Sequence, residues 1–179
     1  MLQILDITHQ TPSFIRIGIQ WALGVFVFLL SLQVSGQSDI DQLLKEYNHV
    51  TVPYISVEEL KEHPSDYLLL DTRKREEYLV SHIPDAIWAS EVVDSAFAKA
   101  YPDRSQPIVV YCSVGIRSED FGERLQKLGY TNVRNLYGSI FLWKNSGYPL
   151  HNQQEKTTDS VHIFSQKWGK YLSKGIKVH

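Results

Sequence analysis

The feature that most constrains this chain of 179 residues is an apolar run that ends at its only cysteine. Residues 108–111 (IVVY) show no alternation of apolar and polar side chains, which is typical of a strand buried on both faces of a parallel sheet. Cys112 follows directly, then a short loop with one glycine, and then residues 118–128, whose apolar side chains recur at helical spacing. The pattern predicts a lone thiol between the end of a buried strand and the start of a helix.

This position favours the reactive form of a cysteine. Free backbone N–H groups and the positive end of the helix dipole stabilise a thiolate relative to a thiol, and Arg117 adds a fixed positive charge nearby. The thiolate is the form that acts as a nucleophile. Cys112 is therefore a candidate catalytic residue, although most free cysteines are inert buried side chains.

The loop at residues 112–117 (CSVGIR) resembles the active-site loop of rhodanese-like single-domain sulfurtransferases, which has the pattern C-x-x-G-x-R followed by Ser or Thr. Further segments resemble motifs of that family in the family's order, at residues 68–73 (LLLDTR), 76–78 (EEY), 82–86 (HIPDA), 136–140 (LYGSI), 143 (W) and 147–149 (GYP). The chain departs from the family at Ser81 and Asp85, where glycines are common. The resemblance covers residues 54–150.

The resemblance implies an α/β protein with the rhodanese-like fold, a central parallel β-sheet flanked by helices on both sides. The residue pattern agrees, because short apolar runs alternate with helical segments. We expect strands at residues 54–55, 68–71, 86–89, 108–111 and 133–136. We expect helices at residues 57–63, 74–80, 90–100, 118–128 and 141–145.

Residues 1–37 and 38–52 are expected to lie outside the domain. The uncharged apolar run at 21–32 follows Arg16 and precedes small residues, which indicates that 1–37 is a signal peptide or, alternatively, an N-terminal membrane anchor. Residues 38–52 are expected to be a linker with a short helix. Both interpretations place the domain, residues 53–150, outside the cytoplasm.

The C-terminal extension, residues 151–179, is expected to contain an amphipathic helix at 159–174. Residues 155–179 carry five lysines against two acidic residues. Such a helix would fold back on the acidic domain or contact a membrane surface or a partner. The family motifs do not extend into this segment.

The resemblance implies that Cys112 accepts sulfane sulfur from a donor such as thiosulfate and forms a persulfide. The sulfur then passes to a thiophilic acceptor such as cyanide or a thiol. Arg117 would meet the donor's negative charge, and loop N–H groups would hold the anionic sulfur. The loop residues expected to bind the substrate are Ser113, Val114, Gly115, Ile116 and Ser118.

Asp71 and Arg73 end another predicted strand, at the edge where open α/β sheets place their sites. We expect them to support the active site, and the alternative is a cap or ion pair that serves only the structure.

Composition narrows the function further. A single cysteine excludes an intrachain disulfide and a cysteine-based metal site, and we expect no metal or other cofactor. The net charge of −2 offers nothing to indicate a nucleic-acid partner. With no second cysteine to resolve the persulfide, the acceptor must be a small molecule or a partner protein's thiol. Membrane contact is expected only if the N-terminal segment is retained.

Two further hypotheses stay open. The domain could be a non-catalytic module that carries sulfur or binds a partner. A phosphatase or arsenate reductase relative would need an arginine six residues after the cysteine, but position 118 is Ser. A separate expectation concerns location. We expect a periplasmic or secreted protein, with a mature chain that starts at Gln37 or Ser38. The alternative is a domain anchored by an N-terminal transmembrane segment.

Overall fold

A parallel sheet of five strands organises the computed structural model, which describes residues 39–89 and 92–179. The signal peptide or anchor expected at 1–37 lies outside the described residues. Within the part of the chain that the structure describes, no helix is both long and apolar enough to cross a bilayer.

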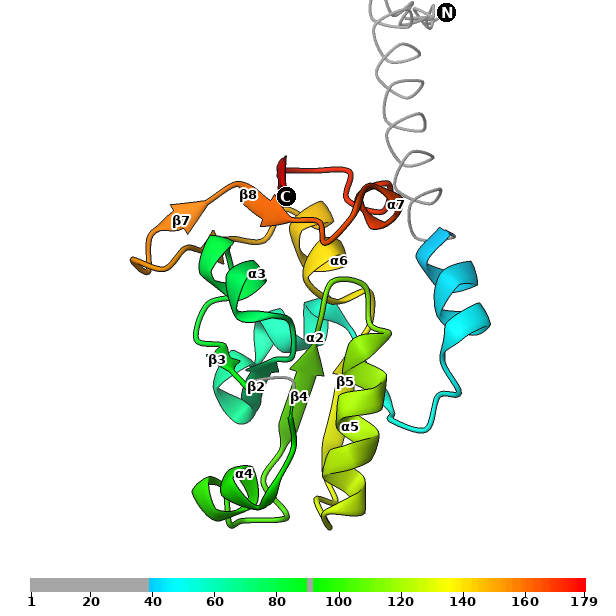
Figure 1. Ribbon diagram of the computed structural model, residues 1–179, viewed down its shortest axis with the longest axis vertical. Helices are drawn as coiled ribbons and strands as arrows, with labels where there is room; N and C mark the ends of the chain where they lie inside the picture. The colour runs from blue at the N-terminus through cyan, green and yellow to red at the C-terminus, as the bar shows by residue number, and fades with distance from the viewer. Residues whose placement is uncertain (1–38, 90–91) are drawn as a thin grey trace, which may run out of the picture. The chain divides into compact units, whose positions relative to one another are not determined.

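The elements are shown in Figure 1, where residues 39–47 form an unlabelled helix before the first strand. They follow one another as β1 (Tyr54–Ile55), α2 (Val57–Glu62), a 3-10 turn (Pro64–Asp66), β2 (Leu68–Asp71), α3 (Arg75–Val80), β3 (Ile87–Trp88), α4 (Ser95–Ala100), β4 (Ile108–Tyr111), α5 (Arg117–Lys127), β5 (Val133–Leu136), α6 (Ser139–Asn145), β6 (Leu150–His151), β7 (Thr157–Thr158), β8 (Ser160–His162), α7 (Gln166–Gly169) and β9 (Ile176–Val178).

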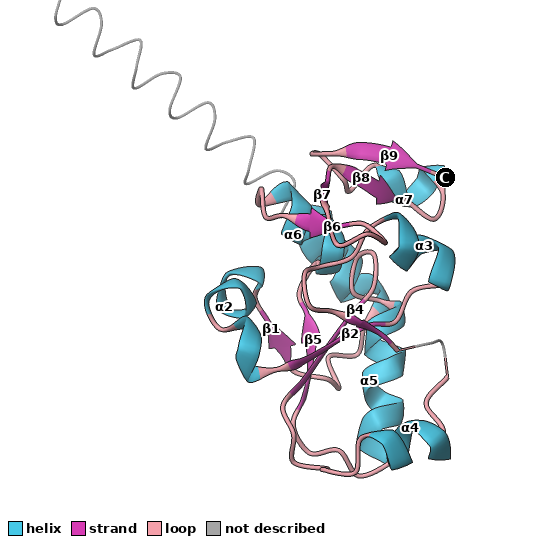
Figure 2. Ribbon diagram, turned by 90° about the vertical axis from the view of Figure 1, so that its left-hand side faces the viewer, coloured by secondary structure: helices cyan, strands magenta, loops and turns pink. Residues whose placement is uncertain are grey.

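The sheet has the order β1-β5-β4-β2-β3, and every neighbouring pair is parallel. β4 lies at the centre, and its side chains alternate between two hydrophobic clusters. Ile108 and Val110 pack in the cluster that includes α4 and α5, whereas Val109 and Tyr111 pack in the cluster that includes α2 and α6. Figure 2 shows helices on both sides of the sheet. The expected fold is confirmed, and so is the strand buried on both faces.

The predicted helices and strands between residues 54 and 145 are confirmed to within two residues at each end, with one exception. The helix expected at 90–100 begins only at Ser95, because the Asp94 carboxylate accepts the backbone N–H groups of Ala96 and Phe97 and caps it there. Residues 90–91 lie outside the described residues. Asp85, which stands where the family has glycine, adopts a φ of 65°, and Asp tolerates this conformation better than most residues.

The segment expected as a linker does contain its short helix, at residues 39–47, and it also packs against the domain. Ile40, Leu43, Leu44 and Val52 are all buried. The helix spacing of the first three explains this, because positions i, i+3 and i+4 share one helix face. This segment is thus part of the structural unit that contains the sheet.

The prediction of an amphipathic helix at 159–174 is wrong. The segment forms β8, the short α7 and, further on, β9, which pairs with β8 in parallel. Val161, Ile163 and Leu172 join the core cluster, so these apolar side chains are buried from an extended chain and a turn instead of one helix face. The close approach of Gly169 to Ile163 shows how tight this turn is, because a Cβ at Gly169 would lie 2.8 Å from Ile163 Cδ1.

Polar contacts tie the same segment to α6. Lys144 Nζ lies 2.5 Å from Asp159 Oδ1, and the Asn145 amide donates to the carbonyl of Tyr171 at 2.8 Å. The Asn145 Oδ1 accepts the backbone N–H of Ser173 at 2.8 Å. The C-terminal segment is therefore fixed beside the end of the sheet that carries Cys112.

Candidate active site

Cys112 lies between the end of β4 and the start of α5, as the sequence predicts. We call residues 112–116 the nucleophile loop. Cys112 is 1% exposed, and its Sγ accepts a hydrogen bond from the backbone N–H of Gly115 at 3.2 Å. Its own N–H donates to Ser139 Oγ at 3.1 Å, and its carbonyl accepts the N–H of Ile140 at 3.2 Å. The N-terminal end of α6 therefore holds the backbone of the nucleophile.

Gly115 is the residue that shapes the loop. Its φ is 112°, which side chains rarely allow, and a Cβ there would meet Leu44 Cδ2 at 3.2 Å. Its carbonyl accepts two amide donors, Asn48 Nδ2 and Asn135 Nδ2, each at 2.9 Å. These two bonds anchor the Gly115 carbonyl and so restrain the loop residue whose N–H donates to the sulfur of Cys112.

Arg117 is paired with a buried carboxylate. Its Nη1 and Nη2 donate to the two oxygens of Glu77, on α3, both at 2.8 Å, and Nη2 also donates to Ser113 Oγ at 3.0 Å. The Glu77 side chain is 0% exposed and the Arg117 side chain is 34% exposed. Burial alone would raise the pKa of Glu77, but the hydrogen bonds and charge of Arg117 hold it below its usual range. The guanidinium therefore faces the pocket with most of its charge already balanced.

The thiol of Cys112 is shifted toward its reactive form. Burial alone would raise its pKa, but the charge of Arg117 and hydrogen bonds from Ser118 and Gly115 outweigh burial and lower it. The Ser118 hydroxyl also donates to Asn135 Oδ1 at 2.7 Å. Because a hydroxyl carries one proton, it serves one of these two acceptors at a time.

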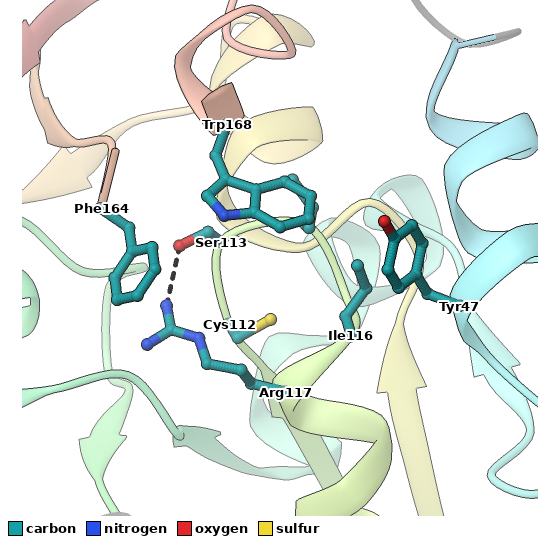
Figure 3. A pocket seen from close by; sticks show the side chains of 8 residues that line it. Tyr47, Cys112, Ser113, Ile116, Arg117, Phe164 and Trp168 are labelled. Atoms are coloured by element: carbon teal, nitrogen blue, oxygen red, sulfur yellow. Dashed lines mark hydrogen bonds between the residues drawn. The ribbon is translucent and has the colours of Figure 1, made fainter. Parts of the chain in front are cut away.

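A cavity of about 320 Å³ opens above Cys112 (Figure 3). Its lining is mostly apolar, and the sulfur lies among side chains from three stretches of the chain. The lining residues are Tyr47, Cys112, Ser113, Val114, Ile116, Arg117, Phe164 and Trp168. Tyr47 ends the first helix, Phe164 follows β8, and Trp168 lies on α7.

Asp71 and Arg73 form a separate buried ion pair that does not line this cavity. Arg73 Nη2 lies 2.6 Å from Asp71 Oδ2 and also donates to the carbonyl of Ser81 at 2.6 Å. Both side chains are 0% exposed. The pair joins the end of β2 to the end of α3, the helix that carries Glu77, so it matches the structural alternative and supports the site only at a distance.

The structure brings together most of the predicted site residues. The residues that line the cavity are Cys112, Ser113, Val114, Ile116 and Arg117. Gly115 and Ser118 do not line it, but they donate hydrogen bonds to the sulfur of Cys112. Sequence reasoning missed the side chains that position or wall the site: Tyr47, Asn48, Glu77, Asn135, Phe164 and Trp168. Only Glu77 carried a signal, since it belongs to a family-like motif. In residues 39–89 and 92–179 there is no group of three His, Cys, Asp or Glu side chains that could hold a metal ion.

Comparison with protein families and solved structures identifies a matching domain family and similar folds. The family model described as the rhodanese-like domain matches residues 56–146. A rhodanese-like domain from Anabaena sp. has a similar fold, with a TM-score of 0.53 and 24% identity over 59% of this chain and 83% of that chain. A thiosulfate sulfurtransferase from Pseudomonas aeruginosa gives a TM-score of 0.50 and 23% identity, covering 76% of this chain and 26% of that one. At these identities the likeness concerns the fold alone.

Curated relatives of similar sequence are named tRNA uridine(34) hydroxylase. The protein from Yersinia enterocolitica is 29% identical over 126 residues, covering 64% of this chain and 34% of that protein. The protein from Sodalis glossinidius is 28% identical over 140 residues, covering 70% of this chain and 38% of that protein. The chain thus spans little more than a third of the length of these relatives.

Proposed function

Because this chain belongs to the rhodanese-like domain family, we propose that it is a sulfurtransferase that carries sulfane sulfur on Cys112. The observation that supports this best is the buried Sγ at the base of the cavity, which accepts the Gly115 N–H and has a lowered pKa. A thiolate held this way is a nucleophile with space above it for an attached sulfur atom.

The reaction has two steps. The Cys112 thiolate attacks the outer sulfur of a donor such as thiosulfate, a new S–S bond forms, and sulfite leaves with the electron pair of the bond that breaks. Cys112 then carries a persulfide anion, which Arg117 and the Gly115 N–H stabilise. An acceptor such as cyanide removes the outer sulfur as thiocyanate and restores the thiolate.

The acceptor comes from outside the chain, because the chain has no second cysteine. A small thiol, cyanide or a partner protein's thiol would each serve. The apolar run at 21–32 supports a further proposal, that the domain acts in the periplasm or outside the cell, whether the N-terminal segment is cleaved or anchors it. N-terminal sequencing of protein from fractionated host cells tests this, and a product found in the cytoplasm with Met1 retained would contradict it.

The experiment on function uses the purified chain, thiosulfate and cyanide, with thiocyanate as the readout. Incubation with thiosulfate should add about 32 Da, the mass of one sulfur atom, to Cys112. Cys112→Ser should lose both the adduct and the turnover while it keeps the fold, because Ser is nearly isosteric. A sulfur adduct without turnover would favour the non-catalytic carrier. Turnover by the Ser variant would refute the mechanism.

The names of the curated relatives offer a second candidate, hydroxylation of a tRNA uridine, and 29% identity over 126 residues is the observation that favours it. The charge of the chain argues against it, since nucleic-acid binding depends on Lys and Arg that neutralise phosphates, and the net charge here is −2. Titration with tRNA at low salt tests this candidate. Saturable binding that weakens steeply with salt would support it over a small-molecule sulfurtransferase.

A further inference from the structure

Three aromatic side chains that wall the cavity come from outside the segment that matches the family model. Tyr47 precedes residues 56–146, and Phe164 and Trp168 follow them. Figure 3 shows Phe164 and Trp168 beside and above the nucleophile loop and Tyr47 beyond Ile116. We call these three side chains the aromatic wall. The reactive sulfur and the wall that surrounds it are therefore supplied by different parts of the chain.

The aromatic wall is held in place by specific contacts. The rings of Tyr47 and Trp168 meet edge to face, with centroids 6.3 Å apart and an interplanar angle of 73°. The Lys167 ammonium lies 5.1 Å from the Trp168 ring centroid and 5.9 Å from that of Tyr47. Aromatic pairs of this geometry and cations over ring faces are both attractive. These contacts therefore join residues that lie near the two ends of the described chain, beside the cavity.

The backbone of Phe164 adopts a strained conformation. Its φ is 61°, in the left-handed region where a bulky side chain is a genuine outlier, and 43% of the residue is exposed. Its ring centroid lies 4.8 Å from the guanidinium carbon of Arg117. A strained backbone that presents an exposed aromatic ring beside a nucleophile is the kind of strain that clusters at functional sites.

Phe164 also lines a second cavity, of about 360 Å³, whose lining includes Lys74, Asp120 and Arg124. Arg117 lines both cavities, and among the described residues it is the one charged side chain in the lining of the cavity above Cys112. The Phe164 ring therefore adds apolar surface beside this charged group, in the space in which a donor must approach the sulfur.

An apolar cavity is a poor place for a small dianion. Thiosulfate would leave its sulfonate end among aromatic rings, and an ion out of water needs paired charges or donors. The nearest guanidinium, that of Arg117, already donates to Glu77 and Ser113. A donor with one negative charge at the sulfur end and an apolar body would match both the loop N–H group and the aromatic wall.

We propose, on the basis of the sulfurtransferase function above, that Tyr47, Phe164 and Trp168 determine specificity and select sulfane donors that carry an aryl group, such as aryl thiosulfonates. The size fits, since an apolar cavity of about 150 Å³ binds benzene and this one measures about 320 Å³. The aryl ring would lie against the aromatic wall and the anionic sulfur against the nucleophile loop.

The chemistry is the same transfer with a different leaving group. The Cys112 thiolate attacks the terminal sulfur of benzenethiosulfonate, and a new S–S bond forms at Cys112. The bond between that sulfur and the sulfonyl sulfur breaks, and benzenesulfinate leaves with the electron pair. Two monoanions give two monoanions, the persulfide and the sulfinate, so no proton or further reactant is needed.

The first test compares benzenethiosulfonate, methanethiosulfonate and thiosulfate as donors to cyanide, using the full chain. We expect kcat/KM for the aryl donor to exceed that for the methyl donor by about tenfold or more, as apolar pockets discriminate by group size. In Phe164→Ala and Trp168→Ala this ratio should fall toward one. Ile176→Ala, which removes an exposed apolar side chain of the same C-terminal segment away from the cavity, should keep it.

The second test does not depend on turnover. Calorimetry measures the binding of benzenesulfinate and methanesulfinate to Cys112→Ser, alone and combined with Phe164→Ala or Tyr47→Ala. We expect the aryl sulfinate to bind at least about tenfold more tightly, with the difference lost when a residue of the aromatic wall is removed and circular dichroism shows the fold intact. Equal binding of the two sulfinates would overturn the proposal.

The two tests separate the failures. If all three donors transfer sulfur with equal kcat/KM, sulfur transfer stands and the selection by the aromatic wall is overturned. If no donor transfers sulfur, the proposed function fails and the specificity proposal with it, even where calorimetry still reports a site for aryl anions.

Discussion

The base and the wall of this site differ in origin and in chemistry. The base consists of Cys112, the N–H of Gly115 and the Glu77–Arg117 pair, all within residues 56–146, and it is polar and charged. The aromatic wall comes from the segments on either side and is apolar. We infer from this comparison that the matched domain provides the reactive thiol, while the flanking segments determine which donors reach it.

The two parts are also stabilised differently. The base depends on buried hydrogen bonds and one ion pair, which are costly to break one partner at a time. The wall depends on ring contacts at a partly exposed surface, which are individually weak. Changes in the base should therefore alter activity with every donor, whereas changes in the wall should alter only the preference among donors.

The largest effect is expected for Arg117→Ala. It leaves the fully buried Glu77 carboxylate without its cation, and breaking such a pair costs about 3 kcal/mol of unfolding free energy. It also removes a charge that lowers the Cys112 pKa, so kcat/KM should fall on the order of a hundredfold for aryl and inorganic donors alike. Chemical denaturation and steady-state assays measure the two effects.

The pH profile sharpens this prediction. Only the thiolate reacts, so kcat/KM should be constant at high pH and fall as the pH drops through the Cys112 pKa, which the charge of Arg117 and the hydrogen bonds to the sulfur lower from its ordinary value. Arg117→Ala should move this acid limb to higher pH, and Arg117→Lys should move it less, because Lys keeps the charge without the bidentate geometry. If the acid limb of the pH profile stays at the same pH in both variants, Arg117 does not act on the Cys112 thiol.

The next effect concerns Glu77→Gln, which keeps the shape and removes the charge. Because the folded pKa of Glu77 is below its unfolded value of about 4.3, its ionised form stabilises the fold above that pH, and the contribution is lost as the pH falls through the folded pKa. We expect a loss of about 2 kcal/mol at neutral pH. Urea unfolding at several pH values should show this difference shrinking below pH about 4, and a constant difference would contradict the prediction.

A smaller effect is expected for Asn135→Ala, which removes one of the two amide donors to the Gly115 carbonyl and the acceptor of the Ser118 hydroxyl. Asn48 still holds the Gly115 peptide, so we expect kcat/KM to fall about tenfold or less, with a stability loss of about 1–2 kcal/mol. Asn132→Ala, before β5 at its other end, is the matched control. Equal losses in the two variants would mean that Asn135 has no positioning role.

The smallest effect should come from Tyr47→Ala. Tyr47 is 44% exposed, and removing its ring contact should cost about 1 kcal/mol of unfolding free energy. The acid limb of the pH profile should stay where it is, because Tyr47 makes no contact with Arg117 or the sulfur that the structure records. A shift of the acid limb in this variant would show that the aromatic wall also affects the Cys112 pKa, which contradicts the separate roles of base and wall.

The sequence predicted the fold and the position of Cys112 between a strand and a helix because both are encoded locally. The unbroken apolar run before Cys112 and the helix spacing after it are read directly from neighbouring residues. The partner of Arg117 could not be read in this way. Glu77 lies forty positions earlier, and the two meet only because α3 and the nucleophile loop lie at the same end of the sheet.

The C-terminal prediction failed for a different reason. Val161, Phe164 and Trp168 recur at helical spacing, but periodicity cannot separate one helix face from a strand and a turn that bury the same side chains. The pairing of β8 with β9 and the left-handed Phe164 decide the outcome, and both depend on tertiary contacts. The sequence could not predict the aromatic wall, because Phe164 and Trp168 are placed by that packing and Tyr47 meets them only through the contact of its ring with Trp168.

The contact between Tyr47 and Trp168 has a consequence for how the protein responds to heat. The two residues come from opposite ends of the described chain, so closing this contact costs more chain entropy than forming the sheet neighbours between them. Exposed elements held by few contacts open locally before the whole domain unfolds. On warming, the protein should first lose its discrimination among donors and only later its turnover. Amide exchange should accordingly be faster at α7 than at β4.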